Sequence, residues 1–126
     1  MLLLEKKHEC YYNEHVKKLK RGVIMIEYDG KPYEDVVGKQ GLVVVQYYAT
    51  WCGPCKMLKP VLDSIATDWT DTPFYRLDID QFRDQAVNAG IRSVPTVVVY
   101  KDGEEVDRQS GYQPRERIES WLTQNK

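Results

Sequence analysis

Two cysteines separated by two residues are the part of this sequence best suited to do chemistry. Cys52 and Cys55 follow a run of strand-forming residues, Leu42 to Ala49, and begin a segment with helical periodicity. Two thiols at this spacing can close a small disulfide bond and reopen it. The spacing therefore predicts redox chemistry.

The two thiols are expected to differ in acidity. A helix N-terminus carries partial positive charge and free backbone N–H groups, which stabilise a thiolate relative to a thiol. We expect Cys52 to occupy that position. Cys55 lies about one turn further into the helix, where desolvation favours the protonated thiol.

A Cys-x-x-Cys pair can also be half of a zinc site or a coincidence. A structural zinc ion needs four ligands, and the chain offers only His8, Cys10 and His15 besides the pair. These three residues lie far upstream and form no second Cys-x-x-Cys motif. We therefore favour the redox interpretation and predict no metal site.

The length and charge of the chain favour one domain without a nucleic-acid partner. The chain has 126 residues, a formal net charge of −1 and interleaved acidic and basic residues. This length suits a single domain with its own core. Without a long basic stripe, we expect binding neither to nucleic acid nor to a membrane surface.

Cysteine usage indicates a reducing compartment. Three cysteines are an odd number and a low density for a disulfide-stapled secreted domain. The first residues, Met1 to Lys7, have a short apolar run with no positive segment ahead of it and no cleavage site, unlike a secretory signal. We therefore expect a cytoplasmic protein.

The N-terminal segment has the periodicity of an amphipathic helix. Apolar residues recur at helical spacing over residues 3–20, and the helix is expected to end near Gly22. Its apolar stripe could pack on its own domain, bind a partner or form a dimer. Cys10 within it could be a small buried side chain or a regulatory thiol.

The rest of the chain alternates between strand and helix patterns. Expected strands cover residues 23–26, 42–48, 74–79, 96–100 and 105–109, and expected helices cover residues 33–37, 52–70, 81–89 and 114–124. Parallel crossovers come first and a hairpin at residues 101–104 comes last. This order predicts an α/β fold with a central mixed β-sheet flanked by helices on both faces.

Several segments, in this order, resemble the thioredoxin family. They are Ala49-Thr50-Trp51-Cys52-Gly53-Pro54-Cys55-Lys56-Met57, Asp78-Ile79-Asp80, Gly90-Ile91-Arg92-Ser93-Val94-Pro95-Thr96, Lys101-Asp102-Gly103 and Gly111. The resemblance implies a thioredoxin domain over residues 23–126 with residues 1–22 as a helical extension. It also implies a thiol-disulfide oxidoreductase that reduces protein disulfides.

The same resemblance implies how the pair would work. Cys52 would be the nucleophile that attacks a substrate disulfide, and Cys55 would resolve the mixed disulfide. No bound cofactor is expected, because the electrons would come from NADPH through a thioredoxin reductase. Expected partners are therefore disulfide-containing proteins and that reductase, and the chain is expected to be a monomer.

Residues around the dithiol are expected to set its potential and to bind substrate. Gly53 and Pro54 would tune the couple, since their backbone geometry controls how the helix N-terminus stabilises a thiolate, and the Gly-Pro pair resembles reducing members of the family. The resemblance places Pro95 at a cis-proline position facing the dithiol, so that the Val94 backbone can pair with an extended substrate.

Trp51 and Gly111 complete the expected substrate surface. Trp51 would shield the dithiol and offer an apolar contact to substrates, or it could be only a packed aromatic residue. Gly111, with Gly90, Ile91 and Val94, would form the rest of a flat, weakly polar docking surface.

The chain departs from the family at one buried position. Thioredoxins usually carry an aspartate where this sequence has Gln46, and a lysine where it has Arg76. An amide cannot accept a proton as a carboxylate does. Gln46 could therefore slow the deprotonation of Cys55, or it could simply fill a hydrogen-bonding position.

Other functions remain open at this point. A dedicated redox partner of one oxidoreductase system would use the N-terminal extension, and an interaction module would keep the fold with a dispensable dithiol. An oxidase or isomerase is disfavoured by the Gly53-Pro54 spacer and by the lack of a signal peptide.

Overall fold

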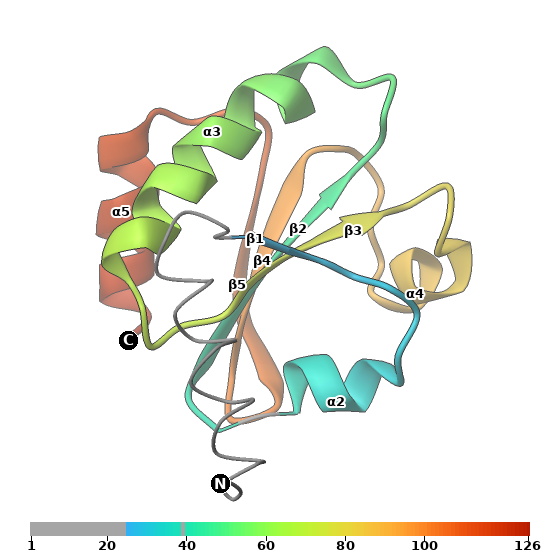
Figure 1. Ribbon diagram of the computed structural model, residues 1–126, viewed down its shortest axis with the longest axis horizontal. Coiled ribbons are helices and arrows are strands. Elements are labelled where there is room, and N and C mark those ends of the chain that lie inside the picture. The colour runs from blue at the N-terminus through green and yellow to red at the C-terminus, as the bar shows by residue number, and fades with distance from the viewer. Residues whose placement is uncertain (1–24, 39) are drawn as a thin grey trace, which may run out of the picture.

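A five-stranded mixed sheet forms the centre of the molecule (Figure 1). The structure is a computed structural model that describes residues 25–38 and 40–126. The strands are β1 (Met25–Glu27), β2 (Leu42–Tyr48), β3 (Phe74–Asp78), β4 (Thr96–Lys101) and β5 (Glu104–Ser110). Their spatial order is β1-β3-β2-β4-β5; β3 runs parallel to β1 and β2, and β4 runs antiparallel to β2 and β5.

Helices cover both faces of this sheet. They are α2 (Tyr33–Val37), α3 (Gly53–Asp68), α4 (Arg83–Asn88) and α5 (Arg115–Gln124). In Figure 1, α3 and α5 lie together over one face, while α2 and α4 lie on the other side. The predicted fold class is confirmed. The helix predicted over residues 3–20, with Cys10, lies outside the described residues.

Strand β2 is covered on both faces, as its apolar run predicts. Val43, Val45 and Tyr47 pack in the core under α2 and α4, and Val44 packs in the core under α3 and α5. Each fully buried valine stabilises the fold by about 1.5–3 kcal/mol relative to an exposed one. The polar exception is Gln46, whose side chain is also fully buried.

The apolar face of α3 holds this helix on the sheet. Leu58, Leu62 and Ile65 follow one another at helical spacing and are completely buried in the same core. The helix continues through Pro60, as predicted. Because proline has no N–H, Pro60 cannot donate the usual bond to the Lys56 carbonyl, so packing must compensate for that turn.

Two helices are shorter than their patterns predicted. The helix predicted over residues 52–70 is Gly53–Asp68, since Cys52 has an extended backbone and acts as the N-cap. The helix predicted over residues 81–89 is Arg83–Asn88. Its start is delayed because the Asp78 side chain accepts the backbone N–H groups of Asp80 and Gln81, which holds these residues in a turn.

A tight hairpin joins β4 to β5 at the predicted place. Asp102 and Gly103 have φ values of 54° and 91°. Asparagine, aspartate and glycine tolerate this left-handed region best, which explains the Asp-Gly pair. The Asp102 carboxylate also accepts the N–H of Gly41 at 2.7 Å and so fixes the hairpin to the start of β2.

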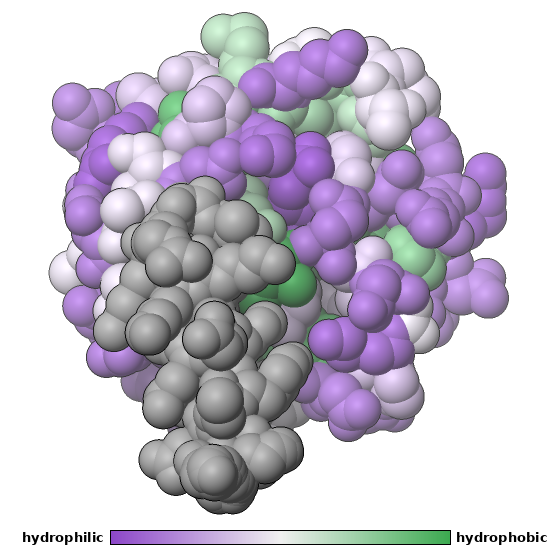
Figure 2. Space-filling model, viewed as in Figure 1, coloured by the Kyte–Doolittle hydropathy of each residue, from purple (hydrophilic) through white to green (hydrophobic). Residues whose placement is uncertain are grey.

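The antiparallel direction of β4 decides which loops meet. Thr96, the first residue of β4, lies opposite Tyr47, the penultimate residue of β2. The segment that follows β2 and the segment that precedes β4 therefore share one edge of the sheet. The surface in Figure 2, outside the grey segment, is mainly hydrophilic, with small separate apolar areas.

Candidate redox site

The two cysteines lie where β2 turns into α3. Cys52 is the N-cap residue of α3, and its N–H donates to the Ala49 carbonyl at 3.2 Å. Cys55 follows in the first turn of the helix. The two side chains form a disulfide bond, with their Cα atoms 5.3 Å apart.

In the first turn of α3, a backbone N–H donates a hydrogen bond to one of the two cysteine sulfur atoms. The backbone N–H of Cys55 donates to Sγ of Cys52 at 3.1 Å. Pro54, which lacks an N–H, precedes this donor, and a Cβ on Gly53 would meet no other described residue within 4 Å. A thiolate on Cys52 would keep this hydrogen bond and the favourable end of the helix dipole.

Both sulfur-bearing side chains are shielded from solvent. Cys52 is 4% exposed and Cys55 is 1% exposed. They cluster with Tyr48 and Ala49, and Val94 packs against this group. Among the described residues, the Cys52 sulfur accepts a backbone N–H and the Cys55 sulfur accepts none.

Trp51 directly precedes Cys52 and exposes its side chain to solvent. Its side chain is 68% exposed, and its indole N–H donates to the Asp80 carboxylate at 2.9 Å. Trp51 is therefore not a packed core residue. A fixed, exposed aromatic ring is instead available for contact with another molecule.

The segment before β4 lies beside the dithiol. The Val94–Pro95 peptide bond is cis. The Pro95 carbonyl accepts the N–H of Gly111 at 2.8 Å, which connects this segment to the residue after β5. Gly111 has a φ of 89°, in the left-handed region that favours glycine. The structure thus brings Trp51, Val94, Pro95 and Gly111 to one edge.

Gln46 lies next to Cys55, on the protein side of the dithiol. Its Nε2 donates to the Cys55 carbonyl over a long 3.5 Å, and its Oε1 has no hydrogen-bond partner among the described residues. The neighbouring residue on β3 is Arg76, as its register with Gln46 requires. Contacts thus connect Gln46 to Cys55, Val94 to the cysteine cluster, and Gly111 to Pro95.

Sequence reasoning missed one charged residue near this edge. Glu27, at the end of β1, accepts hydrogen bonds from Arg76 and from the Tyr48 hydroxyl. Burial and the bond to Glu27 raise the pKa of Tyr48 above its ordinary value, so this hydroxyl stays protonated and donates. A glutamate in a short edge strand carries no sequence signal of such a contact.

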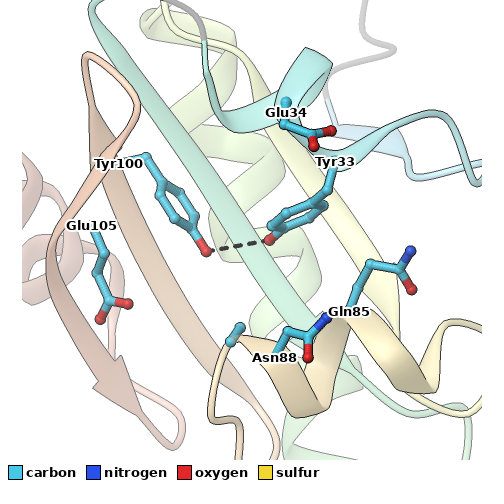
Figure 3. Close-up of a pocket in the computed structure, with 7 residues that line it drawn as sticks. Tyr33, Glu34, Gln85, Asn88, Tyr100 and Glu105 are labelled. Carbon is cyan, nitrogen blue, oxygen red and sulfur yellow. Dashed lines mark hydrogen bonds between the residues drawn. The ribbon is translucent and has the colours of Figure 1, made fainter.

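A separate pocket opens on the α2 and α4 side of the sheet (Figure 3). Its volume is about 480 Å³, and it is lined by Tyr33, Glu34, Gln85, Asn88, Ala89, Tyr100 and Glu105. Behind it the hydroxyls of Tyr33, Tyr47 and Tyr100 are hydrogen-bonded to one another. None of the predicted site residues lines this pocket.

Within residues 25–38 and 40–126, no three His, Cys, Asp or Glu side chains are placed to hold a metal ion. Among the helices of these residues, none has the length and apolar character needed to cross a membrane.

Comparisons with known proteins agree with this geometry. The thioredoxin family model matches residues 24–124. Thioredoxin-2 of Saccharomyces cerevisiae is 48% identical over 73 residues, which are 58% of this chain and 70% of that protein. A thioredoxin of Staphylococcus haemolyticus is 42% identical over 81 residues, which are 64% of this chain and 78% of that protein.

Solved structures of similar proteins have the same fold. A mutant thioredoxin from Halobacterium salinarum has a TM-score of 0.72 and 33% identity, covering 79% of this chain and 88% of its own. A thioredoxin from Nicotiana alata has a TM-score of 0.73 and 30% identity, covering 80% of this chain and 91% of its own. This chain therefore belongs to the thioredoxin family, and it is a thiol-disulfide oxidoreductase.

Proposed function

We propose that this chain reduces disulfide bonds in substrate proteins, with Cys52 as the nucleophile and Cys55 as the resolving thiol. The observation that supports these roles is the N–H of Cys55, which donates to Sγ of Cys52 at the N-terminus of α3. The donor and the helix dipole stabilise negative charge on Cys52. Among residues 25–38 and 40–126, no equivalent donor reaches the Cys55 sulfur.

The reaction proceeds through two exchanges. The Cys52 thiolate attacks one sulfur of the substrate disulfide, so that a mixed disulfide forms and one substrate thiolate leaves and takes up a proton. Cys55 then loses its proton to solvent and attacks Cys52 Sγ. The Cys52–Cys55 bond forms, the bond to the substrate breaks, and the second substrate thiolate leaves and is protonated.

Two electrons must then reopen the Cys52–Cys55 bond. We propose that they come from NADPH through a thioredoxin reductase, with no cofactor bound to this chain. The Gly53-Pro54 pair favours a reducing couple, and the low number of cysteines favours the cytoplasm. We propose that the protein acts there as a monomer, with neither nucleic acid nor a membrane surface as a partner.

Substrates would bind across Trp51, Val94, Pro95 and Gly111. Trp51 is exposed and fixed by Asp80, and it offers an apolar contact beside Cys52. Gly111 leaves open space next to the cis bond of Pro95. An extended substrate segment could therefore reach the backbone of Val94 without a steric clash.

For domain organisation, we propose a thioredoxin domain over residues 23–126. The family model supports this boundary because its match begins at residue 24. Residues 1–22 would form a separate helical extension.

Reduction of insulin tests the proposed function. We expect activity both with dithiothreitol and with NADPH plus a thioredoxin reductase. Cys52→Ser should abolish both activities, and Cys10→Ser, the matched control that removes the third thiol, should leave both intact. Activity with dithiothreitol alone would indicate a dedicated redox partner, and inactivity of the parent with both electron sources would indicate an interaction module.

A further inference from the structure

The polar group next to Cys55 on the protein side carries no charge. Gln46 is completely buried, and its amide is in hydrogen-bond contact with the Cys55 carbonyl. An amide neither gains nor loses a proton in the range where thiols titrate. Any electrostatic control of Cys55 from this side must therefore come from the next charged residues.

Arg76 is the first of these charges. It is the register neighbour of Gln46 on β3, so the two Cα atoms are about 5 Å apart. Its guanidinium carbon lies 3.7 Å from the centre of the Tyr48 ring. The Arg76 side chain is only 16% exposed, so water screens its charge weakly.

Glu27 fixes this arginine from the neighbouring strand. One carboxylate oxygen accepts Nη1 of Arg76 at 3.1 Å, and the other accepts the Tyr48 hydroxyl at 2.5 Å. Glu27 and Arg76 are also register neighbours. Glu27, Arg76 and Gln46 thus form one row across three strands, and the Tyr48 ring connects this row to the cluster around the dithiol.

We propose that Glu27 is a positioning residue of the redox site: it holds Arg76 against Tyr48 and cancels the positive charge that would otherwise favour a thiolate on Cys55. The proposal rests on the proposed function, since it concerns the resolving step. An uncompensated cation close to the dithiol would lower the pKa of a thiol, and an uncompensated carboxylate would raise it.

Other charged residues belong to the segments that meet at this end of the sheet. They are Lys56 in the first turns of α3, Asp78 and Asp80 at and after the end of β3, and Arg92 in the loop before β4. The variants below leave these four residues unchanged. A difference in the apparent pKa of Cys55 between these variants therefore comes from the change at Glu27 or Arg76.

The test measures the pH dependence of Cys55 alkylation in the Cys52→Ser background, with peptide mapping to separate Cys55 from Cys10. Glu27→Gln preserves the side-chain shape and should lower the apparent pKa of Cys55 by about half a unit to one unit. Arg76→Gln should raise it. The double variant should return close to the starting value.

Asp68→Asn is the matched control for the loss of a paired carboxylate. Asp68 binds Arg115 at 2.7 Å, at the end of α3 remote from Cys55, so this variant should leave the profile unchanged. An unaltered profile in Glu27→Gln, or shifts of the same sign in both single variants, would overturn the proposal, as would an equal shift in Asp68→Asn.

The measurement is separate from the proposed function because it needs neither substrate nor reductase. Insulin reduction by the parent tests the function, and the Cys55 profile tests the role of Glu27. With Cys52 restored, Glu27→Gln should also move the pH profile of insulin reduction to lower pH. A loss of rate without a shift of that profile would indicate a structural role only and would overturn the proposal.

Discussion

The backbone N–H of Cys55 donates a hydrogen bond to Sγ of Cys52 over 3.1 Å. One cysteine thus supplies a donor to the other within the first turn of α3, and both residues are buried. The N-terminus of α3 thus gives the two cysteines different surroundings.

This asymmetry predicts selective alkylation. In the reduced protein, iodoacetamide should modify Cys52 before Cys55, with an apparent pKa of Cys52 below the value of about 8.5 of a free cysteine. Peptide mapping after short exposures between pH 5 and pH 9 would measure both rates. Faster labelling of Cys55 would contradict the assignment of roles.

Gln46→Asp should introduce an ionisation beside Cys55. Burial raises the pKa of a carboxyl, so the folded state would hold its proton more tightly than the unfolded state. The variant should therefore lose stability as the pH rises above about 4, the ordinary pKa of aspartate. Near neutral pH it should reduce insulin faster, because a carboxylate can accept the Cys55 proton.

Gln46→Asn is the control for that substitution, because it shortens the side chain as aspartate does but introduces no ionisable group. We would measure the free energy of unfolding in urea between pH 4 and pH 8. Relative to the parent, it should fall with rising pH for Gln46→Asp and stay constant for Gln46→Asn. If the two variants have the same insulin reduction profile as the parent, Gln46 merely fills a hydrogen-bonding position.

The tyrosine hydroxyls behind the pocket of Figure 3 predict a loss of stability in alkali. Burial raises the pKa of Tyr33 and Tyr47 far above the ordinary tyrosine value of 10.0. The unfolded chain therefore loses these protons at lower pH than the folded chain does. Stability is present below pH 10 and should fall as the pH rises above it.

Tyr47→Phe measures this effect. At pH 8 the variant should be less stable by about 1 kcal/mol, because it lacks two hydrogen bonds of Tyr47. At pH 11 this difference should shrink towards zero, since the parent then loses about 1.4 kcal/mol per pH unit through Tyr47. The exposed Tyr112→Phe is the control, and a constant difference for Tyr47→Phe across this range would refute the explanation.

Arg108 should stabilise the loop that leads to Val94 and Pro95 in the proposed substrate surface. Its guanidinium donates to the carbonyls of Ala89 and Gly90 at 2.7 Å and 3.3 Å and binds Glu105 at 2.6 Å. Arg108→Leu should loosen the start of the loop that leads to Val94. We expect a higher KM for insulin with little change in kcat, and a stability loss of about 1–3 kcal/mol.

Arg108→Lys separates charge from geometry. Lysine keeps the charge but cannot reproduce the fork of the guanidinium, so it should resemble Arg108→Leu more than the parent. A parent-like KM in Arg108→Leu would show that the loop needs no such support.

Local patterns predicted most of the fold because they depend on neighbours in sequence. The apolar run of β2 and the Asp102-Gly103 turn each specify their conformation within a few residues. Pro60 did not mislead the prediction, since the apolar spacing continues beyond it. The position of Cys52 at the N-terminus of α3 also follows from local sequence.

Contacts between distant segments escaped prediction. Glu27 contacts Arg76 and Tyr48 only once β1, β2 and β3 have paired. The sequence of a three-residue strand does not predict such contacts. The hydroxyls of Tyr33, Tyr47 and Tyr100 likewise come from three separate segments. Such pairs depend on register, which a single sequence does not encode locally.

The hairpin at Asp102 and Gly103 lies at the end of the sheet opposite the dithiol, because Lys101 pairs with Leu42, the first residue of β2. The seven residues of β2 separate the two ends by about 20 Å. A fluorophore or a surface tether attached at this hairpin would leave Cys52 and its approach clear. This hairpin is therefore a suitable attachment site for following thiol-disulfide exchange on single immobilised molecules.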